Sequence, residues 1–196
     1  MTTPALNLDP KSTALVLIDL QYGIVSMTVQ PQSSQEVVAR GKKLAQAFRA
    51  AKMPVVLVTV GTSADGKDGL APTLDTPPAP AGGAKPDNWS SVVAELEAQD
   101  SDIKIMKRQW GAFYGTDLEL QLRRRGIKTI VLAGISTNVG VESTARDAFE
   151  RGFDQVFVTD AMASPSAEAH AITQKVTFPR MGRSRTTDEV LQSLSK

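Results

Sequence analysis

Short, mostly apolar runs alternate with helical patterns along most of this chain. The runs predict buried strands at 14–18, 55–60, 103–106, 129–133 and 155–158, and a last short strand at 182–185. Between them, apolar residues spaced three and four apart predict helices at 35–52, 116–125, 138–151 and 187–194, with a shorter helix at 91–97. The alternation predicts an α/β fold, a three-layer α/β/α Rossmann-like sandwich with a mostly parallel sheet of about six strands.

Local sequence signals mark several helix ends. Residues able to cap a helix start occur in three places: Ser33 with Glu36, Thr116 with Glu119, and Ser164 before Pro165. Gly126 is the expected stop of the helix at 116–125. The buried face of the helix at 138–151 is expected to carry Val141, Ala145, Ala148 and Phe149.

A Pro- and Gly-rich segment from Gly61 to Asp87 interrupts this alternation. Neither flank could make a complete core alone, so we expect one domain over residues 1–196 with this loop inside it. A loop of this length in a compact domain is usually a functional lid or an interface element.

Composition excludes several function classes. Lys+Arg total 22 against 21 Asp+Glu, a net charge of +1, which disfavours nucleic acid or an anionic membrane as the main partner. No signal segment or membrane-spanning run is visible, so we expect a cytoplasmic protein. The chain has no Cys and a single histidine, His170, so we expect neither a catalytic metal nor a cofactor.

Three candidate groups fall at the carboxyl ends of predicted strands. Asp19 closes the first strand, Lys107 closes the third, and a turn bounded by Gly134 and Gly140 follows the fourth. Ligands of open parallel sheets bind at these strand ends, so the three groups are expected to meet in one crevice. A charged residue at a strand end can also be an ordinary solvent-exposed residue without a function, but the convergence of three groups favours a site.

These residues carry a resemblance to a known family. The segments Lys107-Arg108-Gln109-Trp110-Gly111-Ala112-Phe113 and Gly134-Ile135-Ser136-Thr137-Asn138-Val139-Gly140, together with Asp19 and Gln21, resemble the isochorismatase-like superfamily. The resemblance runs from about Ser12 to Leu194. That superfamily includes isochorismatases, nicotinamidases and N-carbamoyl amidohydrolases.

The resemblance implies a catalytic set of Asp19 and Lys107, and it places Gly140 where most members have a nucleophilic Cys. An acyl-enzyme needs that thiolate, so the covalent amidase route is disfavoured. Isochorismatases resemble this chain in having Gly there, because hydrolysis of a vinyl ether needs acid–base help instead. Asp19 would protonate the substrate or orient a water, and Lys107 would stabilise negative charge.

The resemblance also implies substrate contacts and a backbone feature. The candidate substrate-binding residues are Gln21, Trp110, Phe113, Ser136, Thr137 and Asn138. Core packing is the other interpretation for Phe113. Relatives carry a non-proline cis peptide at the position of Ile135–Ser136, and they commonly form homo-oligomers, so we expect both features here.

Other interpretations of the same residues are weaker. Asp19-Leu20-Gln21 is similar to the first motif of haloacid-dehalogenase phosphatases, but Gln21 cannot replace their second carboxylate. Gly134-Ile135-Ser136 suggests a nucleophile elbow, yet Asn138 stands where the second Gly belongs. We interpret the only possible base, His170, as a structural or pocket-rim residue.

Two alternatives concern proteins without catalysis. A run of arginines at 123–125 suits a solvated last helical turn better than a nucleic-acid site. A relative that lost its nucleophile could also keep the pocket and act as a small-molecule-binding or assembly protein. Retention of both Asp19 and Lys107 favours a hydrolase acting on a small molecule.

Overall fold

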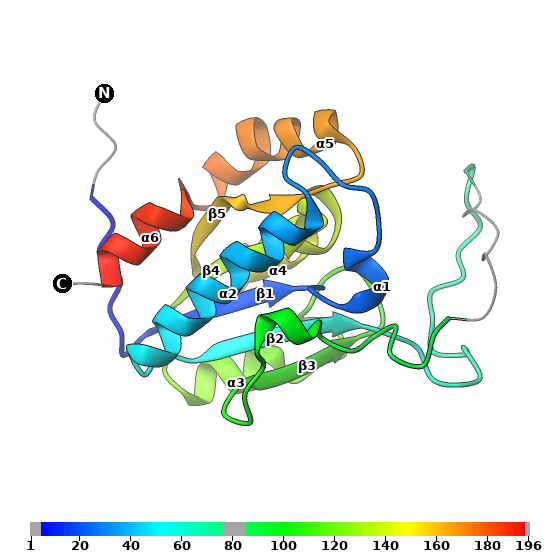
Figure 1. The fold of residues 1–196 in the computed structure, drawn as a ribbon, viewed down its shortest axis with the longest axis horizontal. Helices are drawn as coiled ribbons and strands as arrows, with labels where there is room; N and C mark the ends of the chain where they lie inside the picture. The colour runs from blue at the N-terminus through cyan, green and yellow to red at the C-terminus, as the bar shows by residue number, and fades with distance from the viewer. Residues whose placement is uncertain (1–4, 77–84, 195–196) are drawn as a thin grey trace.

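A computed structural model describes residues 5–76 and 85–194. Its centre is a sheet of six parallel strands in the order β3-β2-β1-β4-β5-β6 (Figure 1). The strands are β1 (Thr13–Ile18), β2 (Val55–Val60), β3 (Ile103–Lys107), β4 (Thr129–Ile135), β5 (Asp154–Ala163) and β6 (Arg183–Arg185). The predicted six-stranded parallel sheet is confirmed.

Helices cover both faces of the sheet. The regular helices are α1 (Tyr22–Val25), α2 (Ser34–Ala50), α3 (Leu118–Arg124), α4 (Glu142–Glu150), α5 (Ala167–Ile172) and α6 (Thr187–Leu194). Short irregular turns are η1 (Ala94–Leu96), η2 (Thr137–Val141), η3 (Thr173–Thr177) and η4 (Phe178–Arg180). Helices α2 and α6 pack on one face, and α3 and α4 pack on the other (Figure 1), which confirms the three-layer α/β/α architecture.

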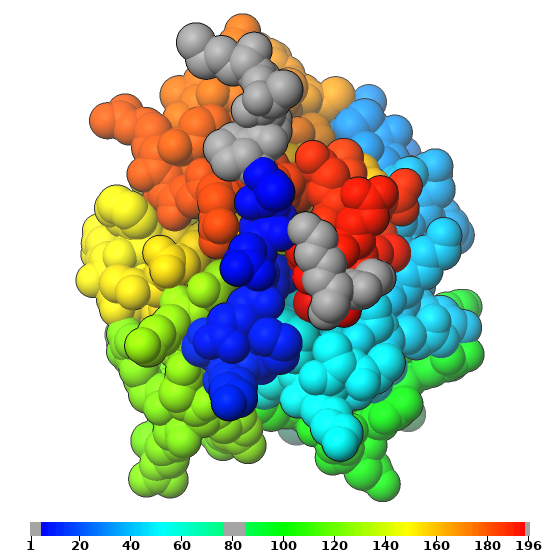
Figure 2. All heavy atoms as spheres, turned by 90° about the vertical axis from the view of Figure 1, so that its left-hand side faces the viewer, coloured from blue at the N-terminus to red at the C-terminus, as the bar shows by residue number. Residues whose placement is uncertain are grey.

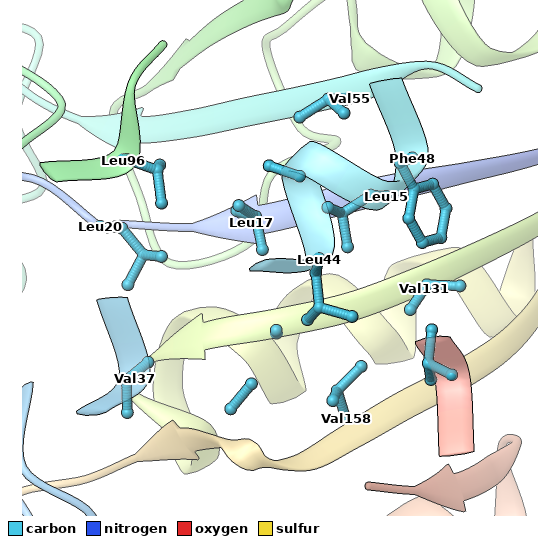
Figure 3. Close-up of a cluster of buried hydrophobic side chains, with 14 of the residues drawn as sticks. Leu15, Leu17, Leu20, Val37, Leu44, Phe48, Val55, Leu96, Val131 and Val158 are labelled. Carbon is cyan, nitrogen blue, oxygen red and sulfur yellow. The ribbon is translucent and has the colours of Figure 1, made fainter. Parts of the chain in front are cut away.

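The alternation of side chains along β1 explains why that strand is apolar throughout. Leu15 and Leu17 belong to the cluster under α2, whereas Val16 and Ile18 belong to the cluster under α3 and α4. In Figure 3 the α2 side chains, Leu44 among them, lie over the sheet residues of the first cluster. Burial on both faces leaves no position for a polar side chain until the strand ends.

The local signals succeed at some helix ends and fail at others. Ser33 and Glu36 form the predicted capping box at the start of α2. The predicted box of Thr116 and Glu119 is wrong: the Thr116 hydroxyl accepts from the Leu118 N–H, but the Glu119 carboxylate pairs with arginines instead. These ion pairs, one to Arg123 a turn further along the helix and one to Arg151, take the place of the local cap.

Three further predictions are corrected. The helix expected from Ser164 begins only at Ala167, because Ser166 accepts the capping bond from the Ala169 N–H. The helix expected at 91–97 is reduced to the single turn η1. Phe149 is 52% exposed rather than buried, since the α4 positions that face the sheet are Thr144, Ala145 and Ala148.

The two ends of the sheet differ in what surrounds them. At the amino ends of the strands, the N-terminal segment runs beside α6 (Figure 2), and its Leu6 and Leu8 are buried in the α2-side core. At the carboxyl ends, the segment 61–76 extends from β2 without helix or strand (Figure 1). Part of the expected loop at 61–87, namely 77–84, lies outside the described residues.

Candidate active site

A cavity of about 500 Å³ opens at the carboxyl ends of β1 and β4. The strand order reverses between these two strands, and such a switch point is where ligands of open α/β sheets bind. The cavity is lined by Asp19, Ile24, Met27, Val60, Lys107, Gln109, Trp110, Ile135, Ser136, Asn138, Val139, Gly140, Ser164, Pro165 and Ser166.

Asp19 and Lys107 form an ion pair at the floor of this cavity. The Lys107 Nζ donates to the Asp19 Oδ2 at 2.7 Å and to the Gln109 carbonyl oxygen at 3.2 Å. Both residues are almost completely buried, with 5% of Asp19 and 2% of Lys107 exposed. Lys107 is the last residue of β3, two strands away from β1, so its long side chain reaches under the end of β2.

The pair is arranged for proton transfer. Burial raises the pKa of Asp19 to about 6, and the charge and hydrogen bond of Lys107 oppose that rise. The Asp19 Oδ1 is buried and has no hydrogen-bond partner among the described residues. A carboxyl group with a pKa near neutrality and one uncommitted oxygen can hold a proton and deliver it to a ligand.

The backbone at Asp19 is held in an uncommon conformation. Its φ is 54°, in the left-handed region that few residues other than Gly adopt. The Asp19 N–H donates to the Val58 carbonyl oxygen at 2.8 Å, so β2 anchors the residue as the chain leaves β1. Uncommon backbone conformations of this kind gather at functional sites, where the surrounding structure maintains them.

The turn after β4 brings a second wall close to Asp19. A Cβ at Gly134 would lie 2.1 Å from the Ile18 carbonyl oxygen, so only glycine permits this approach of β4 to β1. The peptide bond between Ile135 and Ser136 is cis. The chain then enters η2, which contains Gly140.

Gly140 lies in the cavity wall, close against the ion pair. A Cβ there would lie 3.1 Å from the Asp19 Oδ2 and 3.7 Å from the Lys107 Nζ. A side chain at position 140 would therefore touch both charged groups. Glycine at this position therefore keeps the cavity wall free of a side chain beside the pair.

The structure brings most of the predicted site residues together, but not all. Trp110, Ser136 and Asn138 line the cavity. Gln21 does not line it: its side-chain oxygen accepts from the Val60 N–H at 2.7 Å, and its side-chain nitrogen donates to the Val60 carbonyl at 2.9 Å. Gln21 thus fixes the chain beyond β1 to the end of β2.

Phe113 and Thr137 are corrected as cavity-wall residues. Phe113 is 4% exposed in the core, with its ring centroid 5.7 Å from that of Phe153, and is absent from the lining. Thr137 is fully buried, and its hydroxyl bonds the Ala163 carbonyl at 3.2 Å and the His170 Nδ1 at 2.8 Å. His170 therefore has the structural role expected for it.

Several lining residues were missed by the sequence reasoning. Ile24 and Met27 come from α1 and the segment after it, where no periodicity indicates a site. Ser164 was interpreted as a helix cap, but it lies in the wall because β5 continues to Ala163, beyond the predicted strand end. Its position beside a Pro carried no signal of contact with the turn after β4.

The described ranges, 5–76 and 85–194, lack both a metal-binding cluster and a membrane-spanning helix. They contain no group of three or more His, Cys, Asp or Glu side chains that could hold a metal ion. Within the same ranges, no helix is long and apolar enough to cross a membrane.

Comparison with known proteins now decides the family. The Isochorismatase domain model matches residues 13–189, nearly the whole chain. The chain belongs to the isochorismatase family. Its fold is the one that the resemblance implies.

Named relatives and a solved structure agree with this membership. The isochorismatase family protein YecD of Escherichia coli O157:H7 is 55% identical over 96% of this chain and 100% of its own length. The ureidoacrylate amidohydrolase RutB of Agrobacterium fabrum (strain C58) is 32% identical, with 82% of each chain covered. An isochorismatase family protein from Burkholderia thailandensis superposes with a TM-score of 0.93 at 44% identity, covering 98% of this chain and 100% of that one. The chain is thus an isochorismatase-family hydrolase that acts on small molecules.

Proposed function

We propose that this hydrolase cleaves a vinyl ether, or a related C–O or C–N bond, by acid–base catalysis at Asp19 without a protein nucleophile. The observation that carries the proposal is the buried Asp19–Lys107 pair in the cavity wall, which leaves one carboxylate oxygen uncommitted and has Gly140, without a side chain, packed against it. The absence of Cys from the sequence supports it, because no thiolate can form an acyl-enzyme.

The proposed reaction uses Asp19 first as an acid and then as a base. Protonated Asp19 gives its proton to the terminal carbon of the C=C bond, which leaves an oxocarbenium ion on the substrate. A water in the cavity adds to that ion and returns a proton to Asp19. The resulting hemiketal transfers its hydroxyl proton to the ether oxygen and collapses to an alcohol and a ketone, so one water is consumed.

Lys107 has a defined part in this cycle. After Asp19 gives up its proton, the carboxylate is buried, and an isolated buried charge is expensive. The Lys107 Nζ at 2.7 Å stabilises that carboxylate until the water restores the proton. Lys107 therefore tunes the acid without taking part in proton transfer itself.

Hydrolysis of an amide fits the site less well. The name of the RutB relative describes an amidohydrolase, and this cavity could admit a small amide. Without a thiolate, however, water would have to attack an unactivated carbonyl directly. The C–O bond of a vinyl ether needs only the proton that Asp19 can supply.

A substrate screen tests the proposal. Isochorismate, 2-methoxyacrylamide as a simple vinyl ether, and nicotinamide as a simple amide would be incubated with the wild type and with Asp19→Asn. We expect vinyl ether hydrolysis by the wild type and loss of it in the variant. Binding without turnover of any of these compounds would favour the alternative, a small-molecule-binding or assembly protein.

We further propose a cytoplasmic homo-oligomer built from one domain over residues 1–196. The exposed apolar side chains of Leu70 and Leu74 on the extended segment 61–76 support association, as each is more than half exposed. Light scattering at micromolar concentration is the test, and a single monomeric species would contradict it.

A further inference from the structure

Two polar side chains in the cavity wall, Asn138 and Ser164, are bonded to each other. The Ser164 hydroxyl donates to the Asn138 Oδ1 at 2.6 Å and accepts from the Ser166 N–H at 3.3 Å. In this arrangement the one proton of the serine hydroxyl is directed at the Oδ1 of the amide. Asn138 follows β4 and Ser164 follows β5, so this bond joins two separate segments of the wall.

With the Oδ1 of Asn138 bonded to Ser164, the nitrogen end of the amide is available for a ligand. Within the described part of the chain, the Asn138 Nδ2 has no hydrogen-bond partner, although Asn138 lines the cavity. The backbone of Ser164 is held independently, because it exchanges two hydrogen bonds with the backbone of Gln30. The hydroxyl of Ser164 is therefore not needed to hold the strand end in place, and its contact is with the amide.

The charges around the cavity restrict what this amide can bind. Among the lining residues, Lys107 is the one cation and Asp19 the one anion, and they are bonded to each other. Nearby Arg108 is not in the lining, and its guanidinium pairs with Asp68 at 2.5 Å. A ligand carboxylate would thus meet no uncommitted cation on the described walls, and burying an unmatched charge is costly.

We propose that the Asn138 amide donates to an uncharged carbonyl oxygen of the substrate, and that Ser164 is the positioning residue that orients this amide. The substrate class is then a neutral amide or ester whose carbonyl lies beside the scissile bond, and not a dicarboxylate. The inference rests on the proposed function for the scissile bond, but its binding test does not require turnover.

Binding of two saturated probes tests the substrate class. 2-Methoxypropanamide and 2-methoxypropanoate differ in charge and lack the vinyl bond, so neither can be hydrolysed by the proposed route. Titrations followed by NMR at pH 7.5, where Asp19 is ionised and matches Lys107, should show the amide binding about tenfold more tightly. Equal or tighter binding of the carboxylate would overturn the proposal. So would the absence of amide binding at 20 mM, which is about the dissociation constant of the weakest fragments.

Variants test the role of each residue. Asn138→Ala should weaken amide binding about fivefold, the loss of one hydrogen bond, and leave the carboxylate unaffected. Ser164→Ala should weaken it about threefold, whereas Ser164→Thr keeps the hydroxyl and should restore it. Ser193→Ala is the matched control, because that serine bonds the Val190 carbonyl in α6, away from the lining.

A double variant separates positioning from a general structural effect. In the Asn138→Ala background, Ser164→Ala should cause no further loss of amide binding, because nothing remains for the hydroxyl to orient. A further loss of threefold, with thermal melting unchanged, would overturn the positioning role. If 2-methoxypropanamide binds as expected while 2-methoxyacrylamide is not hydrolysed, the proposed reaction fails and the present inference stands.

Discussion

Two buried carboxylates of this protein pair with cations near opposite ends of β3, and they are treated very differently. Asp102, just before the strand, accepts from the Arg49 Nε at 3.0 Å, the Arg49 Nη2 at 2.7 Å and the Gln99 N–H at 2.8 Å. Asp19 meets Lys107, at the other end of β3, through one oxygen only. Both oxygens of the first carboxylate are satisfied, and one oxygen of the second is left free.

The contrast separates an ion pair that stabilises the fold, Asp102 with Arg49, from the pair that we propose takes part in catalysis, Asp19 with Lys107. A bidentate Arg fork with an added backbone donor commits both oxygens of the Asp102 carboxylate to hydrogen bonds. Asp19 has a single Lys contact in a buried setting, and burial raises its pKa to about 6. Of the two, only Asp19 has an uncommitted oxygen, and only Asp19 lines the cavity.

Removing each carboxylate in turn gives the largest expected effect. Asp19→Asn should lower kcat/KM for the vinyl ether by at least about 100-fold, the usual contribution of a general acid. Asp102→Asn should leave turnover of the folded protein within about threefold. It should instead lower the free energy of unfolding by about 3–5 kcal/mol, because it leaves Arg49 without its carboxylate. Steady-state kinetics and urea denaturation of both variants would check this. Equal losses of kcat/KM in the two variants would contradict the different roles given to the two carboxylates.

Adding a side chain at position 140, beside Asp19, should have the next largest effect on kcat/KM. Gly140→Ala places a Cβ 3.0 Å from the Ile18 Cγ2 and 3.1 Å from the Asp19 Oδ2. We expect about a tenfold loss of kcat/KM, about 1.4 kcal/mol of transition-state stabilisation, with little change in melting temperature. Gly140→Ser, slightly larger, should lose more. Unchanged turnover in Gly140→Ala would mean that the close packing of Gly140 against Asp19 does not matter for the reaction.

The variant Gly140→Cys tests whether a thiol at position 140 is sufficient for amidase activity. Lys107 would favour the thiolate form of such a cysteine, but the cavity is shaped around no side chain at this position. We expect no robust nicotinamidase activity, measured as ammonia release. Strong activity would show that the missing sulfur was the sole obstacle to the covalent route.

The smallest expected effect concerns stability at the cavity floor. Replacing both members of the pair in Asp19→Leu/Lys107→Met should change the free energy of unfolding at pH 7.5 by less than about 1 kcal/mol, because an apolar pair avoids the desolvation of two buried charges but Leu is strained at the left-handed φ of 54° at position 19. Urea denaturation measures the change. A loss of several kcal/mol would mean that the pair stabilises the fold and is not retained for chemistry.

The sheet could be predicted from the sequence because both of its faces are covered. The central strands β1, β2 and β4 are apolar runs buried almost throughout, and Asp19 stands out directly after the first of them. Lys107 stands out as the last residue of β3, the strand at the edge of the sheet. The resemblance to the family then located Gly140. The positions of Asp19, Lys107 and Gly140 follow from local sequence patterns and from strand order, and both can be inferred from the sequence.

The rest of the cavity depends on contacts between distant segments. Phe113 lies only three residues from Trp110, yet one is in the core and the other lines the cavity, and nothing in their spacing distinguishes them. Ser164 belongs to the wall only because β5 runs beyond Val158, after the register shift that follows Leu132 of β4. Such details of pairing have no signature in a single sequence.

The pH dependence of vinyl ether hydrolysis tests the central claim most directly, since the claim is that protonated Asp19 is the acid. The folded pKa of Asp19 is raised to about 6, so the active protonated form persists well above its usual range and is lost as pH rises. We predict that kcat/KM of the wild type is level below pH 6 and falls tenfold per pH unit above it, and that Lys107→Met moves the fall to higher pH. A kcat/KM that stays level through pH 6, or rises above it, would contradict the account.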